Sequence, residues 1–181
     1  MSHLIRPIRP DEWPAAKELR LMALRDPVAH LAFLETYEEA LARPDSFWRE
    51  RAEGAAEGAA AARQLIAEGP DGSWAGTLTV LVEVPGTTDW AGFTVERKQG
   101  HVVGVFVRPE QRGTGLAEAL FAAGLEWAWD RGAERVRLIV HEDNARARAL
   151  YRKVGFAPSG VTVPLTADSG ESELELVIER P

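Results

Sequence analysis

The sequence contains no cysteine. Disulfide bonds, thiolate metal ligands and a cysteine nucleophile are therefore excluded. Long apolar stretches are also missing, because no run approaches the roughly 18 apolar residues of a membrane-spanning helix and the N-terminus has no apolar signal-peptide segment. We therefore expect a cytoplasmic protein that does not interact with membranes.

Lysine is scarce, and positive charge is not clustered. The chain has 21 Lys and Arg residues against 28 Asp and Glu residues, a formal net charge of −7, and lysine occurs only at Lys17, Lys98 and Lys153. Nucleic-acid binding depends on clustered Lys and Arg that neutralise phosphates, so we expect no nucleic-acid partner. The acidic balance mildly favours a cationic or neutral substrate, although an acidic surface that keeps a protein in solution is the more frequent cause.

The length of 181 residues suits a single domain. A chain of this length buries roughly 70% of its unfolded surface on folding, whereas two domains would each be small. We expect one domain over 1–181, with helices and the first strands in 1–100, a central binding core in 101–160 and a C-terminal strand in 161–181.

Apolar periodicity and capping residues predict a mixed order of helices and strands. The expected helices follow an N-cap at Asp11 as far as Pro27, cover 31–41, and run from 45 until they fray near 59. The expected strands cover 4–8, a hairpin over 63–83 with its turn at 70–72, then 156–163 and 173–179, with a loop over 84–100.

The segment 101–156 carries the most informative pattern. A strand, HVVGVFV, ends before Pro109, and the loop QRGTGLA leads directly into the helix EALFAAGLEWAWDRG. Such a loop presents free backbone N–H groups and the positive end of a helix dipole at one place, which suits a phosphate group. Gly113 and Gly115 allow the main chain to approach that phosphate closely.

Two other phosphate-binding motifs fit this loop less well. In the dinucleotide fingerprint G-x-G-x-x-G the third glycine would fall on Glu118, where close helix packing requires Gly or Ala. A P-loop would need Gly-Lys followed by Ser or Thr, which the loop does not have. A turn that simply requires two glycines is the remaining alternative.

The loop resembles the acetyl-coenzyme A loop of the Gcn5-related N-acetyltransferase (GNAT) family. Arg112, Gly115 and Ala117 occupy its Gln/Arg-x-x-Gly-x-Gly/Ala positions, after a Val-x-Pro at 107–109. The family's second block, Asn-x-x-Ala-x-x-Leu-Tyr followed by Gly-Phe, falls on Asn144, Ala147, Leu150, Tyr151, Gly155 and Phe156. Together, at the separation that one helix and one strand require, the two motifs make a specific signal over about a third of the chain.

The resemblance implies a single-domain α/β fold, with a mixed sheet whose central strands splay apart, and acetyl-coenzyme A as acyl donor. Splayed strands leave backbone groups unpaired, and the amides of the pantetheine arm can pair with them. The family's cofactor contacts fall on the backbone of Val105, Phe106 and Val107 for pantetheine, on the amides of Gln111, Arg112, Gly113, Thr114, Gly115, Leu116 and Ala117 for the pyrophosphate, and on Asn144 for the arm. Arg112 would add a positive charge and Thr114 a hydroxyl donor.

The resemblance further implies transfer of an acetyl group to a primary amine, by direct attack and without a metal. Tyr151 corresponds to the family's general acid, because a phenol can return a proton to the departing thiolate. His101 is the first candidate for the base that deprotonates the amine, since we expect it on the same strand face as Val103 and Val105. Glu83, or a water chain, is the alternative base.

The acceptor amine stays open, and so does a homodimer. Aromatic rings suit a flat apolar part and carboxylates an ammonium group, so candidate acceptor residues are Phe33, Glu35, Tyr37, Glu38, Trp48 and Trp90. The polar run His141, Glu142 and Asp143 is typical of a solvated strand end and not of a metal site. The main rival function is a non-catalytic acyl-coenzyme A sensor or assembly module on the same fold.

Overall fold

Seven strands form one mixed sheet in a computed structural model that describes residues 3–89, 92–164 and 172–181. The strands are β1 Leu4–Pro7, β2 Ala62–Glu68, β3 Trp74–Glu83, β4 Gln99–Val107, β5 Arg135–His141, β6 Ala157–Pro164 and β7 Ser172–Glu179. Their order in the sheet is β1-β2-β3-β4-β5-β7-β6, and among the described strands only β4 and β5 pair in parallel. The mixed α/β fold expected from the sequence is confirmed.

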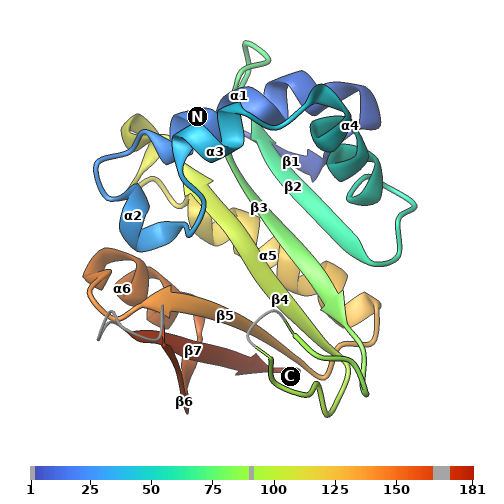
Figure 1. Ribbon diagram of the computed structural model, residues 1–181, viewed down its shortest axis with the longest axis vertical. Helices are drawn as coiled ribbons and strands as arrows, with labels where there is room; N and C mark the ends of the chain where they lie inside the picture. Colours follow the sequence, from blue (N-terminus) through green and yellow to red (C-terminus); the bar gives the residue numbers. More distant parts are fainter. Residues whose placement is uncertain (1–2, 90–91, 165–171) are drawn as a thin grey trace.

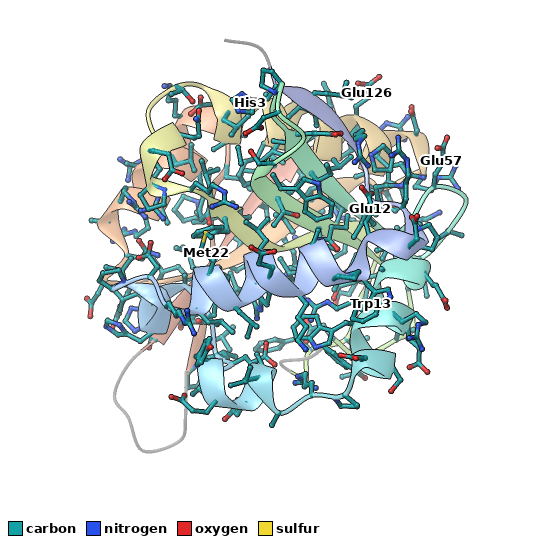
Figure 2. The ribbon with its side chains drawn as sticks, turned by 90° about the horizontal axis from the view of Figure 1, so that it is seen from above. His3, Glu12, Trp13, Met22, Glu57 and Glu126 are labelled. Carbon is teal, nitrogen blue, oxygen red and sulfur yellow. The ribbon has the colours of Figure 1, made fainter. Side chains whose placement is uncertain are left out.

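Helices cover both faces of this sheet. They are α1 Trp13–Leu24, α2 Ala29–Ala32, α3 Tyr37–Leu41, α4 Asp45–Gly54, α5 Leu116–Asp130 and α6 Ala145–Val154. In Figure 1, α5 lies behind the sheet, and α1 and α4 lie over its other face. Figure 2 shows α1 crossing the strands, with Glu12 and Trp13 at one end and Met22 at the other. No helix in the described parts of the chain has the length and apolarity needed to cross a bilayer.

Strand alternation divides the core between the two faces. Leu78 and Val80 of β3 pack with Leu120 of α5, and all three side chains are fully buried. Each such burial stabilises the fold by about 1.5–3 kcal/mol. Gly124 lets α5 approach β3, because a Cβ at this position would lie 3.2 Å from the side chains of Leu78 and Val80. A larger residue at 124 would therefore push the helix away from the sheet.

Two expectations for the N-terminal third are wrong in detail. The expected helix over 31–41 is divided into α2 and α3, because Thr36 starts a new helix: its hydroxyl accepts a hydrogen bond from the backbone N–H of Glu39 at 3.2 Å. Asp11 does not cap α1. It lies exposed in a 3₁₀ turn, and Glu12 accepts the hydrogen bond from the backbone N–H of Arg9 at 2.8 Å.

The central strands diverge, as expected. The ladder between β4 and β5 runs only from Gln99 to Val102 and then stops. Just beyond the end of this ladder, on the β3 side of β4, two residues of β4, Gly104 and Val105, lie opposite the single residue Leu78 of β3. This two-against-one pairing is a β-bulge in β4. Gly104 has φ +64°, a conformation that glycine adopts without strain. The diverging ends of β4 and β5 face α2 and α6 in Figure 1.

The bulge corrects the expected orientation of His101. Uninterrupted alternation would place His101 on the same face as Val105, as predicted from the sequence. Instead, the three β3 residues opposite His101, Val103 and Phe106 share one face of the sheet. The side chains of His101, Val103 and Phe106 therefore lie on that face as well. This is the face covered by α1 and α4, since Phe106 packs in the core cluster that contains Leu19.

Candidate active site

A cavity of about 350 Å³ lies where β4 and β5 diverge. Its walls come from the end of β4, the loop at 111–118, α6, and the segment from Asp26 to Phe33. The predicted site residues that line it are Val105, Phe106, Val107, Gln111, Arg112, Gly113, Gly115, Ala117, Asn144 and Tyr151. Two sequence motifs separated by a helix and a strand thus meet around one cavity.

Unpaired backbone N–H groups gather at the start of α5. Among the described residues, the N–H groups from Gly113 to Glu118 have no hydrogen-bond acceptor. The amides of Gln111 and Arg112, which we also expected to hold the pyrophosphate, already donate to the carbonyls of Arg108 and Pro109. The free N–H groups therefore start two residues later than the loop predicted to hold the pyrophosphate, and they lie at the positive end of a 15-residue helix, an arrangement that suits an anion.

Three of the predicted cofactor side chains serve the protein itself. The Thr114 hydroxyl donates to the carbonyl of Gln111 at 2.6 Å. The Leu116 side chain is buried in the core cluster between α5 and the sheet. Neither residue lines the cavity. The guanidinium of Arg112 donates to the Asp26 carboxylate at 2.7 Å and, through Nε, to the carbonyl of Val107 at 3.0 Å. Arg112 thus ties the loop to the end of α1.

The ion pair of Arg112 determines the charge of Asp26. Burial alone would raise the pKa of Asp26, but the hydrogen bonds from Arg112 and the backbone N–H of Val28 outweigh it and leave this pKa below its ordinary value. Arg146 and Lys153 of α6 also line the cavity, and Lys153 Nζ lies 3.8 Å from the carboxylate of Glu118, which lines it too. Sequence reasoning missed Arg146 and Lys153, although they are seven residues apart, like Asn144 and Tyr151, and therefore share a helix face.

Tyr151 presents a phenol to the cavity from a closely packed aromatic cluster. Its ring contacts Phe121 edge to face, with ring centroids 5.6 Å apart, and Phe156 packs against both. Burial raises the pKa of Tyr151 to about 12. Its hydroxyl has no hydrogen-bond partner among the described residues. The side chain of Asn144, by contrast, caps α6 by accepting a hydrogen bond from the N–H of Ala147 at 3.3 Å.

Neither candidate base lines the cavity. Glu83 accepts hydrogen bonds from Gln99 at 2.8 Å and from Arg137 at 2.9 and 3.1 Å. Burial would raise the pKa of Glu83, but its hydrogen bonds with His101, Arg137 and Gln99 lower it to about 2, which makes this carboxylate a weak base. His101 is 2% exposed, and its Nδ1 lies 3.6 Å from Glu83. Sequence reasoning missed Arg137, the buried centre of this ionic cluster, which also pairs with Glu175 at 3.0 Å.

The polar run after β5 is less solvated than expected. His141 is buried, with 2% exposure, and its Nδ1 accepts a hydrogen bond from the backbone N–H of Asp143 at 3.0 Å. The side chain of Asp143 is exposed. Within the described ranges, no three His, Asp or Glu side chains come together as metal ligands.

Comparison with known proteins agrees with this geometry. Residues 13–156 match the sequence profile of the acetyltransferase (GNAT) family. The chain belongs to this family. A mycothiol acetyltransferase of Saccharomonospora viridis is 50% identical over 60 residues, which are 33% of this chain and 20% of that protein. The matched region spans between 18% and 56% of the length of the first curated relatives.

Solved structures of GNAT proteins share the fold. The PaiA N-acetyltransferase of Thermoplasma acidophilum, solved in complex with coenzyme A, superposes with a TM-score of 0.72 at 15% identity, over 97% of this chain and 98% of that one. Nourseothricin acetyltransferase is 34% identical over 66% of each chain, with a TM-score of 0.52. The family resemblance and the splayed-strand fold predicted from the sequence are both confirmed.

A second, smaller cavity of about 40 Å³ lies on the α1 and α4 side of this GNAT sheet. Phe33 and Trp48, two of the expected acceptor residues, line it. Glu35 does not, because its carboxylate pairs with Arg20 at 3.1 Å and Arg43 at 2.6 Å. The other expected residues lie elsewhere: the Tyr37 ring stacks under Arg25, Glu38 is exposed on α3, and Trp90 lies outside the described residues.

Proposed function

We propose that this protein transfers an acetyl group from acetyl-coenzyme A to a primary amine of a small molecule or peptide, by direct attack of the amine on the thioester. The cavity at the splay carries this proposal, because one end has the unpaired N–H groups of Gly113 to Glu118 and another wall has the Tyr151 hydroxyl. The first suits a pyrophosphate and the second a departing thiolate. The acetyltransferases among its relatives and structural neighbours support the same reaction.

The donor fits between the two diverging strands. Beyond Val102 the β4 backbone has no β5 partner, so the amides of a pantetheine arm can take the place of the missing ladder along Val105 to Val107. The pyrophosphate would lie at the α5 N-terminus, with Arg146 and Lys153 adding positive charge near the mouth. The thioester would then lie within reach of the Tyr151 hydroxyl.

His101 remains the first candidate for the base, acting through water because its side chain does not line the cavity. Glu83, at 3.6 Å, would stabilise the positive charge that His101 acquires. Glu83 itself is the weaker candidate, because a carboxyl with a pKa of about 2 rarely accepts a proton at neutral pH. The cytoplasmic location, the absence of a nucleic-acid partner and a homodimer stay predictions.

A thiol-release assay tests the proposal. The protein is mixed with acetyl-coenzyme A and a panel of small amines, amino acids and peptide N-termini, and free coenzyme A is measured over time. Acetyl transfer predicts release that depends on one class of amine and a mass increase of that amine by one acetyl group. A protein that binds acetyl-coenzyme A in calorimetry but releases no thiol with any amine would instead be a sensor or assembly module.

A further inference from the structure

The smaller cavity lies next to the larger one. Phe33 and Phe106 form walls of both, and Gly104 of the bulge lines the smaller one. A ligand in the smaller cavity is therefore separated from the proposed acetyl-coenzyme A site only by these two rings. This position suits part of the acceptor, because the acceptor amine must reach the thioester at the splay while the rest of the molecule binds outside the donor site.

The smaller cavity has six polar side chains, of which three, the two guanidinium groups and the indole, can only donate hydrogen bonds. The six are the side chains of Arg20, Trp48, Arg51, Gln64, Thr77 and Thr79, and no Asp or Glu belongs to the described lining. The indole N–H of Trp48 is buried and has no acceptor, an arrangement that costs free energy unless a ligand supplies one.

The charges around this cavity are unbalanced. Arg20 shares the carboxylate of Glu35 with Arg43, which lies outside the lining, and among the described residues Arg51, which is exposed to solvent, has no carboxylate within ion-pair distance. Three guanidinium groups thus face one carboxylate. Burial lowers the pKa of Arg20 even though Glu35 hydrogen-bonds to it, which is expected where positive charge lacks a full set of counter-ions. A bound anion would restore the balance.

We propose that the acceptor amine also carries a compact anionic group, a carboxylate in the first instance, which binds Arg51 and the indole N–H of Trp48. This inference rests on the proposed acetyltransferase function and names the substrate class for it. The volume of about 40 Å³ exceeds the roughly 10–15 Å³ that one water requires, so the cavity admits a carboxylate-sized group. The expectation that carboxylates of the pocket bind an ammonium group is replaced, because Glu35 is already paired with arginine.

Matched pairs of acceptors test the inference. Each pair consists of an amino acid and its α-carboxamide with the same side chain, and kcat/KM is measured by thiol release. Conversion to the carboxamide lowers the pKa of the amine and so favours its attack, which makes a preference for the acid a measure of binding and not of nucleophilicity. We expect kcat/KM for the acid to exceed that for the amide by at least about 10-fold.

Substitutions in α4 test whether Arg51 causes the preference for the acid over the carboxamide. Arg51→Gln is expected to lower kcat/KM for the acid about 10- to 100-fold, mainly through KM, and to leave the amide unchanged. Arg51→Lys keeps the charge and should recover part of the loss. The control is Arg49→Gln, which makes the same change in net charge on the same helix, where the guanidinium stacks 5.4 Å from the Trp13 ring outside the cavity lining. It should leave both substrates unaffected.

Each outcome bears on one proposal. Equal use of acid and amide, or an unchanged KM for the acid in Arg51→Gln, overturns the anion site and leaves acetyl transfer standing. No thiol release with any amine overturns acetyl transfer, and thermal shifts with N-acetylglycine and N-acetylglycinamide, in the presence of coenzyme A, then test the anion site directly. Stabilisation by N-acetylglycine alone, lost in Arg51→Gln, supports the site, whereas equal or absent shifts overturn it.

Discussion

Tyr151→Phe removes one hydroxyl from the main cavity and leaves the ring packed against Phe121. Burial raises the pKa of Tyr151 to about 12, whereas an alkyl thiol such as cysteine has a pKa of about 8.5. Complete proton transfer from this phenol to a thiolate is uphill by about 5 kcal/mol, so we expect the hydroxyl to stabilise the thiolate chiefly by donating a hydrogen bond. Such a bond to a charged group contributes about 1.5–3 kcal/mol, which predicts a fall in kcat of about 10- to 150-fold.

The measurement is thiol release at saturating acetyl-coenzyme A, combined with calorimetry of acetyl-coenzyme A binding. Affinity should change little, because the departing thiolate exists only during the reaction. Tyr37→Phe is the control, since the chain has 2 tyrosines and Tyr37 lies outside both cavities. Unchanged kcat in Tyr151→Phe would remove this residue from the mechanism. A fall well beyond about 1000-fold would refute the hydrogen-bond argument and require full proton transfer.

Three further predictions concern the loop, the ionic cluster and the base. Gly115→Asp should abolish the rise in Tm that acetyl-coenzyme A causes, about 2.7 kcal/mol of stabilisation at 100 times Kd, because it adds negative charge beside the free N–H groups. Gly72→Asp, at a similar φ of +84° in the β2–β3 turn, is the control for backbone strain. A Tm shift in Gly115→Asp equal to that of the unchanged protein would contradict the loop assignment. Because the pKa of Glu83 is depressed to about 2, the stabilisation of the fold by this carboxylate, roughly 3 kcal/mol, is complete above about pH 4.5 and disappears as the pH falls toward 2. Glu83→Gln should therefore lower Tm at pH 7 and flatten the decline of Tm in acid. A parallel decline of Tm in both proteins would contradict this role of Glu83. His101→Ala should slow turnover at neutral pH, with partial recovery at high pH where the amine is already neutral. A wild-type pH profile in this variant would leave water or Glu83 as the base.

Local patterns account for the parts of the site that the sequence could predict. Gly113, Gly115 and the helix start are neighbours in the chain, so a short motif contains nearly all the geometry of the anion-binding turn. Asn144 and Tyr151 lie on one helix face for the same reason. Arg146 and Lys153 were also predictable as a pair, since they have the same spacing of seven residues on the same helix.

Other parts depend on pairs that the chain separates widely. Arg112 and Asp26 are 86 residues apart, and Arg137 and Glu83 are 54 apart, so no local pattern marks either pair. Both pairs changed the interpretation of predicted residues. Arg112 also ties the loop to the segment after α1, and Glu83, the weaker candidate for the base, also belongs to a buried ionic cluster.

The sequence by itself determined the family, most of the order of helices and strands, and the glycine-bearing turn before α5, because periodicity, capping and glycine positions act over a few residues. Tertiary structure alone decided on which face His101 lies, since the bulge at Gly104 and Val105 is set by how β4 pairs with β3. It also decided the charge of the smaller cavity. Arg20 comes from α1 and Arg51 from α4, and only the packing of these helices on the sheet brings their positive charges to one place.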